Sequence, residues 1–378
     1  MKVNRRDFLA QTGMAAAVAA AGAVIPQAGE PNGVSVAQQA QGAKTMLNVA
    51  VLSKWHPHAK GYAQSLKKMP DVKISAVWDE DAARGQEWAK ELEAPFEGNL
   101  DAVLARKDVD AICVTAPTSM HPEIMIGAAK AGKHIFTEKV LALTVKDCNR
   151  IGKAVRAANV KFCISFPYRT RPDCLYAHKA VQDGLLGQLT SLRVRVAHNG
   201  ASAAWLPAHF YDPKTCGGGA MMDLGAHPMY LSRWFCGQPK RISSTFTSMT
   251  GHEIEDNAVS VIEFENKSIA VSETSFVSTN SPFTLELSGT EGSLVVGGPE
   301  DRHVTIQSTK LESKGWVTPP ELPAAPPAAI QMWVDAILRN GTIPFGIEEA
   351  TQLTELMEYA YIAHRKQRQV EIPPRASV

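Results

Sequence analysis

Several features that would direct this 378-residue sequence to a particular partner are absent or scarce. The formal net charge is only +1, so there is no excess of charge that would indicate nucleic acid or an anionic membrane. No CxxC pair occurs among the six cysteines, which argues against zinc-ribbon sites and redox dithiols. After the N-terminal segment, no apolar run has the length that a membrane-spanning helix needs.

What is present is the composition of an ordinary globular protein, with 45% hydrophobic and 20% charged residues. A chain of this length is long for one hydrophobic core, so two domains are expected. No internal repeat is evident, which argues against a solenoid or an array.

The N-terminus has the pattern of a targeting segment. Paired arginines in Asn4–Leu9 precede an alanine-rich apolar run from Met14 to Pro26. This pattern resembles a twin-arginine export signal. We therefore expect a signal peptide over residues 1–37, ending at Ser35-Val36-Ala37, and a polar spacer over 38–45. The resemblance implies the Tat translocase as a partner during export, and a periplasmic or otherwise exported location.

From Met46 the sequence alternates between strand and helix patterns, which predicts an α/β domain with a doubly wound parallel sheet over residues 46–166. In such sheets ligands bind beyond the carboxyl ends of the strands, where Asp79, Pro117 and Glu138-Lys139 fall. The predicted strands are Leu47–Leu52, Val72–Trp78, Ala111–Val114, His134–Thr137 and Phe162–Phe166, and the predicted helices are Ala59–Lys68, Ala82–Leu92, Leu100–Ala105, a helix from Thr118 or Ser119 to Ala131, and Thr144–Asn159.

After Arg171 the pattern changes to strands with few helices between them, which predicts an α+β domain with an open, mostly antiparallel sheet over residues 167–327. Residues 328–378 are expected to form C-terminal helices and a tail that pack back on the body. The predicted strands are Ser191–Ala197, Arg241–Ser248, Ala258–Glu263, Ser268–Phe276, Thr284–Ser288, Ser293–Val296 and Val304–Gln307, and the predicted helices are Cys174–Gly184, Ala328–Arg339 and Ile347–Arg365.

The stretch Cys216–His227 combines three consecutive glycines with an acid and an imidazole four positions apart. On a helix, residues i and i+4 share a face, so Asp223 and His227 would point the same way beyond a flexible entrance. A general base and the carboxylate that orients it could be held together in this manner. The alternative is an ordinary helix with a surface acid and a packed histidine.

Several motifs occur together in order. They are Thr115-Ala116-Pro117 with His121, Ala131–Ile135, Glu138-Lys139-Val140, Phe166–Arg169 with Pro172, and Gly217–His227. The combination resembles the glucose–fructose oxidoreductase / inositol dehydrogenase family, called Gfo/Idh/MocA, from about Leu47 to the C-terminal helices. The resemblance implies a Rossmann domain that binds NAD(H) or NADP(H), an open-sheet domain that forms the substrate pocket and homo-oligomer contacts, and sugars, polyols or their oxo forms as substrates.

The resemblance also implies roles for individual residues. Lys139, Asp223 and His227 would be catalytic: His227 takes the hydroxyl proton, Asp223 orients it, and Lys139 stabilises alkoxide charge. An acid at Asp79 favours NAD over NADP, because it would repel a 2′-phosphate. The expected cofactor contacts are Ser53, Lys54, Trp55, Asp79, Thr115, Pro117, His121, Glu138 and Lys139, and the expected substrate contacts are Tyr168, Arg169, Trp205, His209 and Tyr211.

The sequence departs from the family pattern in two places. The family has G-x-G-x-x-G after the first strand, whereas this chain has Ser53–His58, in which Trp55 would crowd a diphosphate and Lys54 offers an ammonium instead. Val140 stands where the family usually has proline. His56 and His58 have no acid or cysteine beside them in the sequence, so we predict no metal site.

These observations leave three functions open. The leading one is a sugar or polyol oxidoreductase with tightly held NAD, because an exported enzyme meets little free cofactor. The second is a glycosidase of the same family, working by transient oxidation and elimination or without cofactor, with Asp223 and His227 as acid or base. The third is a non-catalytic sugar-binding or accessory protein, which the missing glycines favour and the Lys–Asp–His set opposes.

Overall fold

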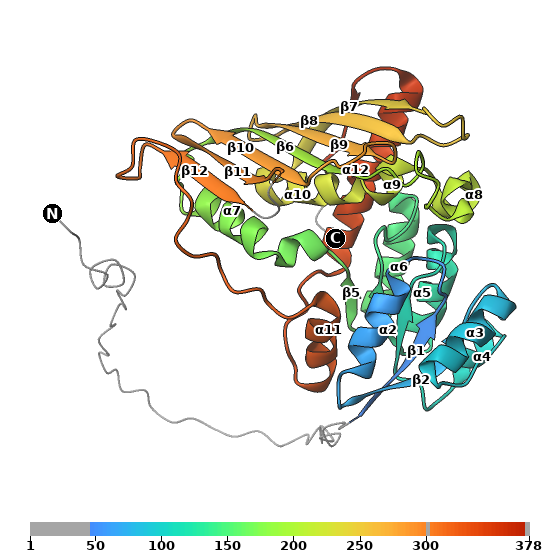
Figure 1. The fold of residues 1–378 in the computed structure, drawn as a ribbon. Helices are drawn as coiled ribbons and strands as arrows, with labels where there is room; N and C mark the ends of the chain where they lie inside the picture. Colours follow the sequence, from blue (N-terminus) through green and yellow to red (C-terminus); the bar gives the residue numbers. More distant parts are fainter. Residues whose placement is uncertain (1–45, 300–302, 375–378) are drawn as a thin grey trace, which may run out of the picture. The chain divides into compact units, whose positions relative to one another are not determined.

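A five-stranded parallel sheet forms the N-terminal part of the computed structural model, which describes residues 46–299 and 303–374 (Figure 1). The predicted signal peptide and spacer lie outside these residues. The strand order is β2-β1-β3-β4-β5, and all neighbouring pairs are parallel. The strands are β1 (Leu47–Leu52), β2 (Val72–Trp78), β3 (Ala111–Val114), β4 (His134–Thr137) and β5 (Phe162–Ile164).

The strand order places several predicted residues at one edge of this sheet. Because β1 pairs with β2 on one side and β3 on the other, the chain changes direction of winding there, which is where doubly wound sheets bind ligands. Ser53 follows β1, Asp79 follows β2, Thr115 follows β3 and Glu138 follows β4. Parallel strands end at the same edge, so these residues gather although they are far apart in the sequence.

The helices of this part begin where the sequence supplies capping side chains. Asp81 accepts the N–H groups of Ala83 and Arg84, and Thr144 accepts that of Asp147. The helices are α2 (Ala59–Lys67), α3 (Ala82–Leu92), α4 (Leu100–Ala105), α5 (His121–Lys130) and α6 (Val145–Ala158), with a 3₁₀ turn, η2 (Thr118–Met120), before α5.

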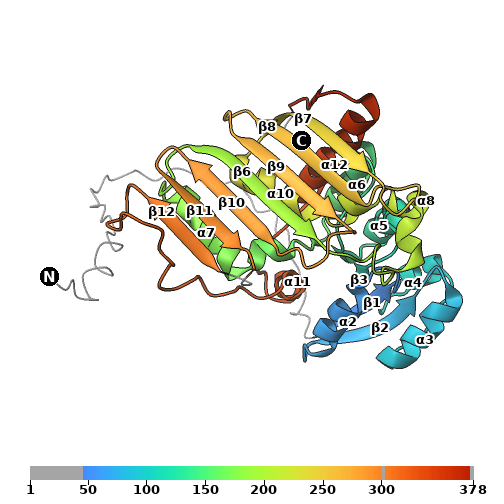
Figure 2. The ribbon, with the colours of Figure 1, turned by 45° about the horizontal axis from the view of Figure 1, so that its top comes forward.

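The second sheet has eight strands in the order β12-β11-β10-β6-β9-β8-β7-β13 (Figure 2). Only β6 and β9 pair in parallel, so the prediction of an open, mostly antiparallel sheet is confirmed. Along β8, buried and more exposed residues alternate, as expected when one face packs on a core. The strands are β6 (Leu189–Ala197), β7 (Pro239–Thr247), β8 (Asn257–Phe264), β9 (Ile269–Ser275), β10 (Thr284–Gly289), β11 (Gly292–Gly297), β12 (Val304–Ser308) and β13 (Val370–Glu371).

The C-terminal helices join the two sheets into one body. α11 (Ala329–Leu338) packs against α2 and β5, and α12 (Ile347–Lys366) packs against α6, α10 and β7. Trp333 of α11 is fully buried with its ring beside Phe136 of β4. The described residues belong to a single compact unit, so the predicted domain boundaries at 166/167 and 327/328 remain predictions.

The glycine-rich stretch folds differently from a single helix. α8 (Pro213–Cys216) is followed by three glycines and α9 (Ala220–Asp223), and α10 (Ala226–Cys236) begins after a break at Leu224-Gly225. Asp223 and His227 therefore belong to two helices. Within residues 46–299 and 303–374, no helix combines the length and apolar character needed to cross a bilayer.

Candidate active site

An ion pair between Lys139 and Asp223 forms the centre of the candidate site. The Lys139 ammonium donates to the Asp223 carboxylate and, at 2.9 Å, to the Asp223 main-chain carbonyl. The Lys139 side chain is 1% exposed and that of Asp223 is 17% exposed. Although burial favours the neutral acid, the charge of Lys139 and the contact with His56 hold the pKa of Asp223 well below its ordinary value. The site thus holds a desolvated carboxylate bound to an ammonium.

The three glycines before Asp223 pack closely against their neighbours. Gly217 has φ +79°, a conformation that favours glycine, and a side chain at Gly219 would meet the Glu255 carbonyl at 1.9 Å. The Glu255 carboxylate accepts the N–H groups of Gly219 and Met221, and the Tyr361 hydroxyl at 2.6 Å. The expected flexible entrance is instead a turn held in place by the half-buried Glu255, which fixes the position of Asp223.

His227 lies close to this pair but has a different hydrogen-bond partner. Its side chain is buried, and Nδ1 lies 3.0 Å from the hydroxyl of Tyr230, which accepts the N–H of Tyr168 and is placed to donate to His227. Burial, with the charge of Lys139 next, holds the pKa of His227 well below its ordinary value. The imidazole is therefore neutral, and this pattern leaves its proton on Nε2. In this tautomer Nε2 is a hydrogen-bond donor rather than the proton acceptor expected from the sequence.

His56, His58 and Glu138 form a cluster beside the ion pair, with ligand atoms that all lie within 4.8 Å of one another. His58 Nδ1 lies 3.0 Å from Glu138 Oε2, which also accepts the hydroxyl of Tyr62. Burial favours the neutral acid, but the neighbouring imidazoles of His58 and His56 outweigh it and lower the pKa of Glu138. The prediction of no metal rested on the lack of an acid near the two histidines in the sequence. In space, Glu138 is that acid.

The loop after β1 offers no free donors to a diphosphate. In Rossmann domains the diphosphate binds main-chain N–H groups at this loop and at the start of the next helix. Here every such group from residue 53 to residue 59 has a partner inside the protein, and Pro57 has none to offer. The acceptors are Trp78 O for Ser53, Asp79 Oδ2 for Lys54, Ser53 Oγ for Trp55, Thr115 O for His56, His56 Nδ1 for His58 and His56 O for Ala59.

The space next to Lys139 is also filled. Trp55 stacks on Phe210, with ring centroids 5.4 Å apart, and both side chains are buried. The cavity that remains between Trp55, Lys139 and Asp223 has a volume of about 20 Å³. This is room for about one water molecule, whereas ligand pockets start at about 300 Å³. In this conformation the residues do not fit a nicotinamide dinucleotide.

Asp79 does not present a free acceptor to a ribose. Its side chain is fully buried and receives two hydrogen bonds from Arg84, at 2.6 and 3.0 Å. The main-chain N–H groups of Lys54 and Asp81 complete its partners at 2.8 and 2.9 Å. The Lys54 ammonium pairs with Glu91 at 2.7 Å, away from a phosphate role. Both residues support the fold of the β1 and β2 ends.

The other expected cofactor contacts also serve the fold. The Thr115 hydroxyl donates to the Ser53 carbonyl, and Pro117 precedes η2. His121 is buried with its ring nitrogens 3.0–3.1 Å from the carbonyls of Ala116, Val140 and Leu141. The Lys139–Val140 peptide bond is cis.

The expected substrate contacts are scattered. Tyr168 lies beside His227, with ring centroids 4.9 Å apart, and His209 packs on Trp55. Arg169 instead lies between the rings of Trp234 and Phe345, within 5.0 Å of each. Trp205 is 55% exposed beside His198, and Tyr211 stacks on His252. The structure thus places Tyr168 and His209 at the site and the other three outside it.

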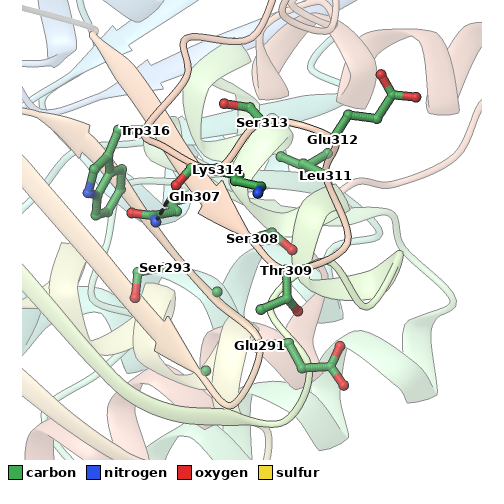
Figure 3. Close-up of a pocket in the computed structure, with 12 residues that line it drawn as sticks. Glu291, Ser293, Gln307, Ser308, Thr309, Leu311, Glu312, Ser313, Lys314 and Trp316 are labelled. Carbon is green, nitrogen blue, oxygen red and sulfur yellow. Dashed lines mark hydrogen bonds between the residues drawn. The ribbon is translucent and has the colours of Figure 1, made fainter.

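A larger cavity of about 580 Å³ lies elsewhere, at the edge of the second sheet between β11, β12 and the loop 309–316 (Figure 3). Gln307 donates to the Lys314 carbonyl across it at 3.2 Å, and Trp316 stands at its margin, 51% exposed. It contains none of the buried charged side chains described above. We therefore place the candidate active site at Lys139 and Asp223.

Two family models match the chain. Residues 55–166 match the "Oxidoreductase family, NAD-binding Rossmann fold" model, and residues 174–295 match the "GFO/IDH/MocA C-terminal domain" model. Scyllo-inositol 2-dehydrogenase (NAD(+)) of Bacillus subtilis is 29% identical over 278 residues, which cover 68% of this chain and 74% of that protein. Levoglucosan dehydrogenase of Pseudarthrobacter phenanthrenivorans is 24% identical over 60% of this chain and 65% of that protein.

Among solved structures, levoglucosan dehydrogenase in complex with NADH and levoglucosan superposes with a TM-score of 0.77 at 20% identity. The alignment covers 86% of this chain and 99% of that chain, so the two folds are alike throughout. Both matched segments fall on the two sheets, in the expected order. The chain belongs to the GFO/IDH/MocA family of oxidoreductases.

Proposed function

We propose that this protein is an oxidoreductase that acts on the CH–OH group, or the corresponding carbonyl, of a sugar or polyol. The observation that carries the proposal is the buried Lys139–Asp223 ion pair with the neutral imidazole of His227 nearby. The relatives named as inositol and levoglucosan dehydrogenases support the choice of substrate class. Exported enzymes meet little free cofactor, so a tightly held NAD(H) belongs to the proposal.

The chemistry of the site follows from its donors. In the reduction direction, Lys139 and the Nε2–H of His227 would donate hydrogen bonds to the carbonyl oxygen, and the Lys139 ammonium would give its proton to the alkoxide that forms. In the oxidation direction, the hydroxyl proton would pass to the neutral amine of Lys139. Asp223 keeps Lys139 in position and supplies its counter-charge. The cavity beside Lys139 is about 20 Å³, so a substrate there needs room that the stacked rings of Trp55 and Phe210 occupy in this conformation.

The match to an NAD-binding Rossmann model supports NAD(H) as the hydride carrier of the family. The β1–α2 loop described above does not fit a dinucleotide, since its N–H groups are engaged and Trp55 fills the space. We therefore assign roles only to side chains of this chain and derive no hydride step. NAD binding would require the loop 53–58 to rearrange.

The closed loop after β1 favours a second candidate, which is a lyase or glycosidase that works on a sugar without bound dinucleotide. In that case Asp223 and His227 would serve proton transfers in an elimination, with Lys139 stabilising the charged oxygen. Such an enzyme needs the acid–base groups and has no use for a diphosphate loop. A family member that retains the cofactor and cleaves glycosides by transient oxidation would instead use both the acid–base groups and the bound dinucleotide.

One purification separates these functions. The exported protein is denatured, and released NAD or NADP is measured by mass spectrometry, with calorimetric titration of added NAD. Bound nucleotide with oxidation of a polyol supports the oxidoreductase. No nucleotide, no binding of added NAD and cleavage of a glycoside without redox change would replace it by the second candidate. Neither binding nor turnover would indicate a sugar-binding protein that has lost its cofactor.

A His227→Ala variant refines the first outcome. It should retain any nucleotide and lose turnover, because His227 would contact only the reacting oxygen. Loss of nucleotide together with turnover would make His227 structural. The periplasmic or otherwise exported location, the removal of residues 1–37 and the homo-oligomer also belong to this proposal. The mature N-terminus of the secreted protein and its mass in solution test them.

A further inference from the structure

The cluster formed by His56 and His58 in the loop after β1 and by Glu138 after β4 is not used by the proposed chemistry. We propose that His56, His58 and Glu138 bind one divalent metal ion of the first transition row, and zinc is the ion that we expect. Two imidazoles and one carboxylate form a known ligand set for zinc and for related ions. The ligand atoms already lie within 4.8 Å of one another. Zinc bonds of about 2.0–2.1 Å bring neighbouring ligand atoms to about 3.3 Å, so rotations of these side chains complete the site.

Both ring nitrogens of His56 have a partner in this conformation, so an ion bound at Nδ1 would replace the N–H of His58 there. The main-chain N–H of His58 donates to His56 Nδ1 at 3.2 Å, so Nδ1 carries a lone pair rather than a proton. The proton is then on Nε2, which faces Asp223 Oδ1 at 3.8 Å. Metal-binding histidines commonly have a carboxylate at the nitrogen that does not bind the metal. Asp223 occupies that place for His56.

Glu138 is oriented by a neighbour of its own. The Tyr62 hydroxyl donates to Glu138 Oε2, and Glu138 Oε1 accepts the main-chain N–H of Lys139 at 3.0 Å. The carboxylate is therefore held while its Oε2 points at His58 Nδ1, 3.0 Å away. Outer partners of this kind fix the ligands of metal sites before the ion arrives.

The charges around the cluster favour a cation. Glu138 and Asp223 carry two negative charges, and Lys139 is the one ammonium among the cluster's described contacts. Once both imidazoles are deprotonated, as metal ligands are, the group keeps one net negative charge beside the buried Glu138. Buried charge is stabilised when it is paired or coordinates a metal.

Access to the cluster is available on the side of His58. Its side chain is 47% exposed and lines a cavity of about 470 Å³, together with Tyr62 and Ser165. His56 lines the small cavity that contains Lys139 and Asp223, and the two imidazole centroids are 4.6 Å apart. The ion would thus have an open coordination position toward the larger cavity and lie next to the ion pair.

The sequence around the site gives the same indication. Dinucleotide loops need bare backbone where the diphosphate approaches. This loop has His-Pro-His instead, and it ends at the start of α2, from which Tyr62 reaches Glu138. The inference does not depend on the proposed function, because an ion can bind here whether or not the protein oxidises a sugar.

The test uses cobalt as a spectroscopic probe. The full-length mature protein is dialysed against chelator, its metal content is measured, and Co²⁺ is titrated while the visible d–d absorption is recorded. We expect one equivalent of Co²⁺ to bind with the absorption of a nitrogen–oxygen site, and one equivalent of Zn²⁺ to displace it. Binding should also raise the melting temperature, since an ion bound only by the folded state stabilises it.

The key variant is His58→Ala, because the exposed His58 side chain can be removed with little loss of packing. It should weaken Co²⁺ binding by about 100-fold or more. Glu138→Gln should do the same, and His303→Ala, an exposed histidine outside the cluster, should bind like the wild type. Each variant's circular dichroism checks its fold. No stoichiometric binding by the wild type, or equal binding by His58→Ala, would overturn the proposal and leave a hydrogen-bonded cluster alone.

Discussion

The loop after β1 (residues 53–58) and the turn after β4 (residues 138–140) reach the same edge of the parallel sheet with different chemistry. The turn presents Lys139, whose ammonium binds Asp223 in a nearly solvent-free position. The loop presents Trp55, which stacks on Phe210, and donor groups that are all engaged within the protein. One region is prepared for acid–base chemistry, and the other is closed to a dinucleotide.

The difference teaches that the two halves of a dehydrogenase site have separate physical requirements. The acid–base half needs a few side chains with fixed partners, which the packed glycine turn and Glu255 provide. The dinucleotide half needs unpaired main-chain donors and empty space. A single large side chain at Trp55 removes the space without disturbing Lys139. Substitutions in each region can therefore be compared directly.

The largest expected effect is on turnover in the Lys139→Met variant. Loss of the ammonium removes the donor that stabilises the charged oxygen, and turnover on the identified substrate should fall about 1,000-fold. Steady-state kinetics measures it. Lys54→Met is the control, because its ion pair with Glu91 is partly exposed and its loss should change turnover by no more than about twofold.

Lys139→Met also leaves the Asp223 carboxylate without its counter-charge, which costs about 3–5 kcal/mol when a buried pair is broken. The double variant Lys139→Met/Asp223→Asn removes that charge as well. Its free energy of unfolding should recover while turnover remains lost. If turnover recovers with stability, Lys139 is structural and the comparison between the two regions fails.

The next effect is on stability, in the loop. Trp55→Ala removes a buried indole that stacks on Phe210 and packs on His209, and should lower the free energy of unfolding by about 3 kcal/mol or more. Urea unfolding measures it. Turnover at a temperature where the variant is folded should fall far less than in Lys139→Met. An equally large loss of turnover would place Trp55 in the catalytic machinery.

The third prediction concerns pH. The pKa of His227 in the folded protein lies well below its ordinary value because of burial and the charge of Lys139. Below about pH 6.5 the unfolded chain therefore binds a proton that the folded protein does not, so stability falls as pH falls. In His227→Gln this dependence should weaken by up to about 1.4 kcal/mol per pH unit between pH 6.5 and 5. Parallel stability curves for both proteins would mean that the pKa of His227 is not lowered in the folded protein.

The sequence predicts most of the fold because local patterns determine its elements. β1, β2 and β3 have the expected bounds, and α6 lies between its predicted limits because Thr144 caps it and Asn159 ends it in a left-handed conformation. The break at Leu224-Gly225 was not predicted, since it depends on packing around Gly225, where a side chain would meet the Met221 carbonyl at 2.4 Å. The two-residue β13 has no periodicity to detect.

Some residues of the candidate site could be predicted from the sequence, and others could not. The resemblance led to Lys139 and Asp223, 84 positions apart, and the structure brings them into contact. Glu138 and His58 are 80 positions apart, and nothing in a single sequence links them. The direction of Arg169 depends on which aromatic rings surround it, so its place between Trp234 and Phe345 could not be read from its motif.

The smallest expected effect is the coupling between Trp55 and Phe210. In a double-mutant cycle with alanine at both positions, the interaction free energy should be about 1 kcal/mol, as for other stacked aromatic pairs. Trp55 paired with Phe246 is the control: Phe246 is buried against His364, so those two changes should be additive within about 0.5 kcal/mol.

Coupling between Trp55 and Phe210 means that the loop after β1 and the segment that carries Phe210 (η4, Ala208–Tyr211) hold each other closed. A substrate or a dinucleotide must then supply at least this free energy to enter beside Lys139, which raises its dissociation constant by about fivefold at 1 kcal/mol. If the two changes are additive, the rings separate without loss of interaction free energy, and the space for a dinucleotide opens freely. In that case, only the engaged N–H groups of the loop still distinguish the two regions.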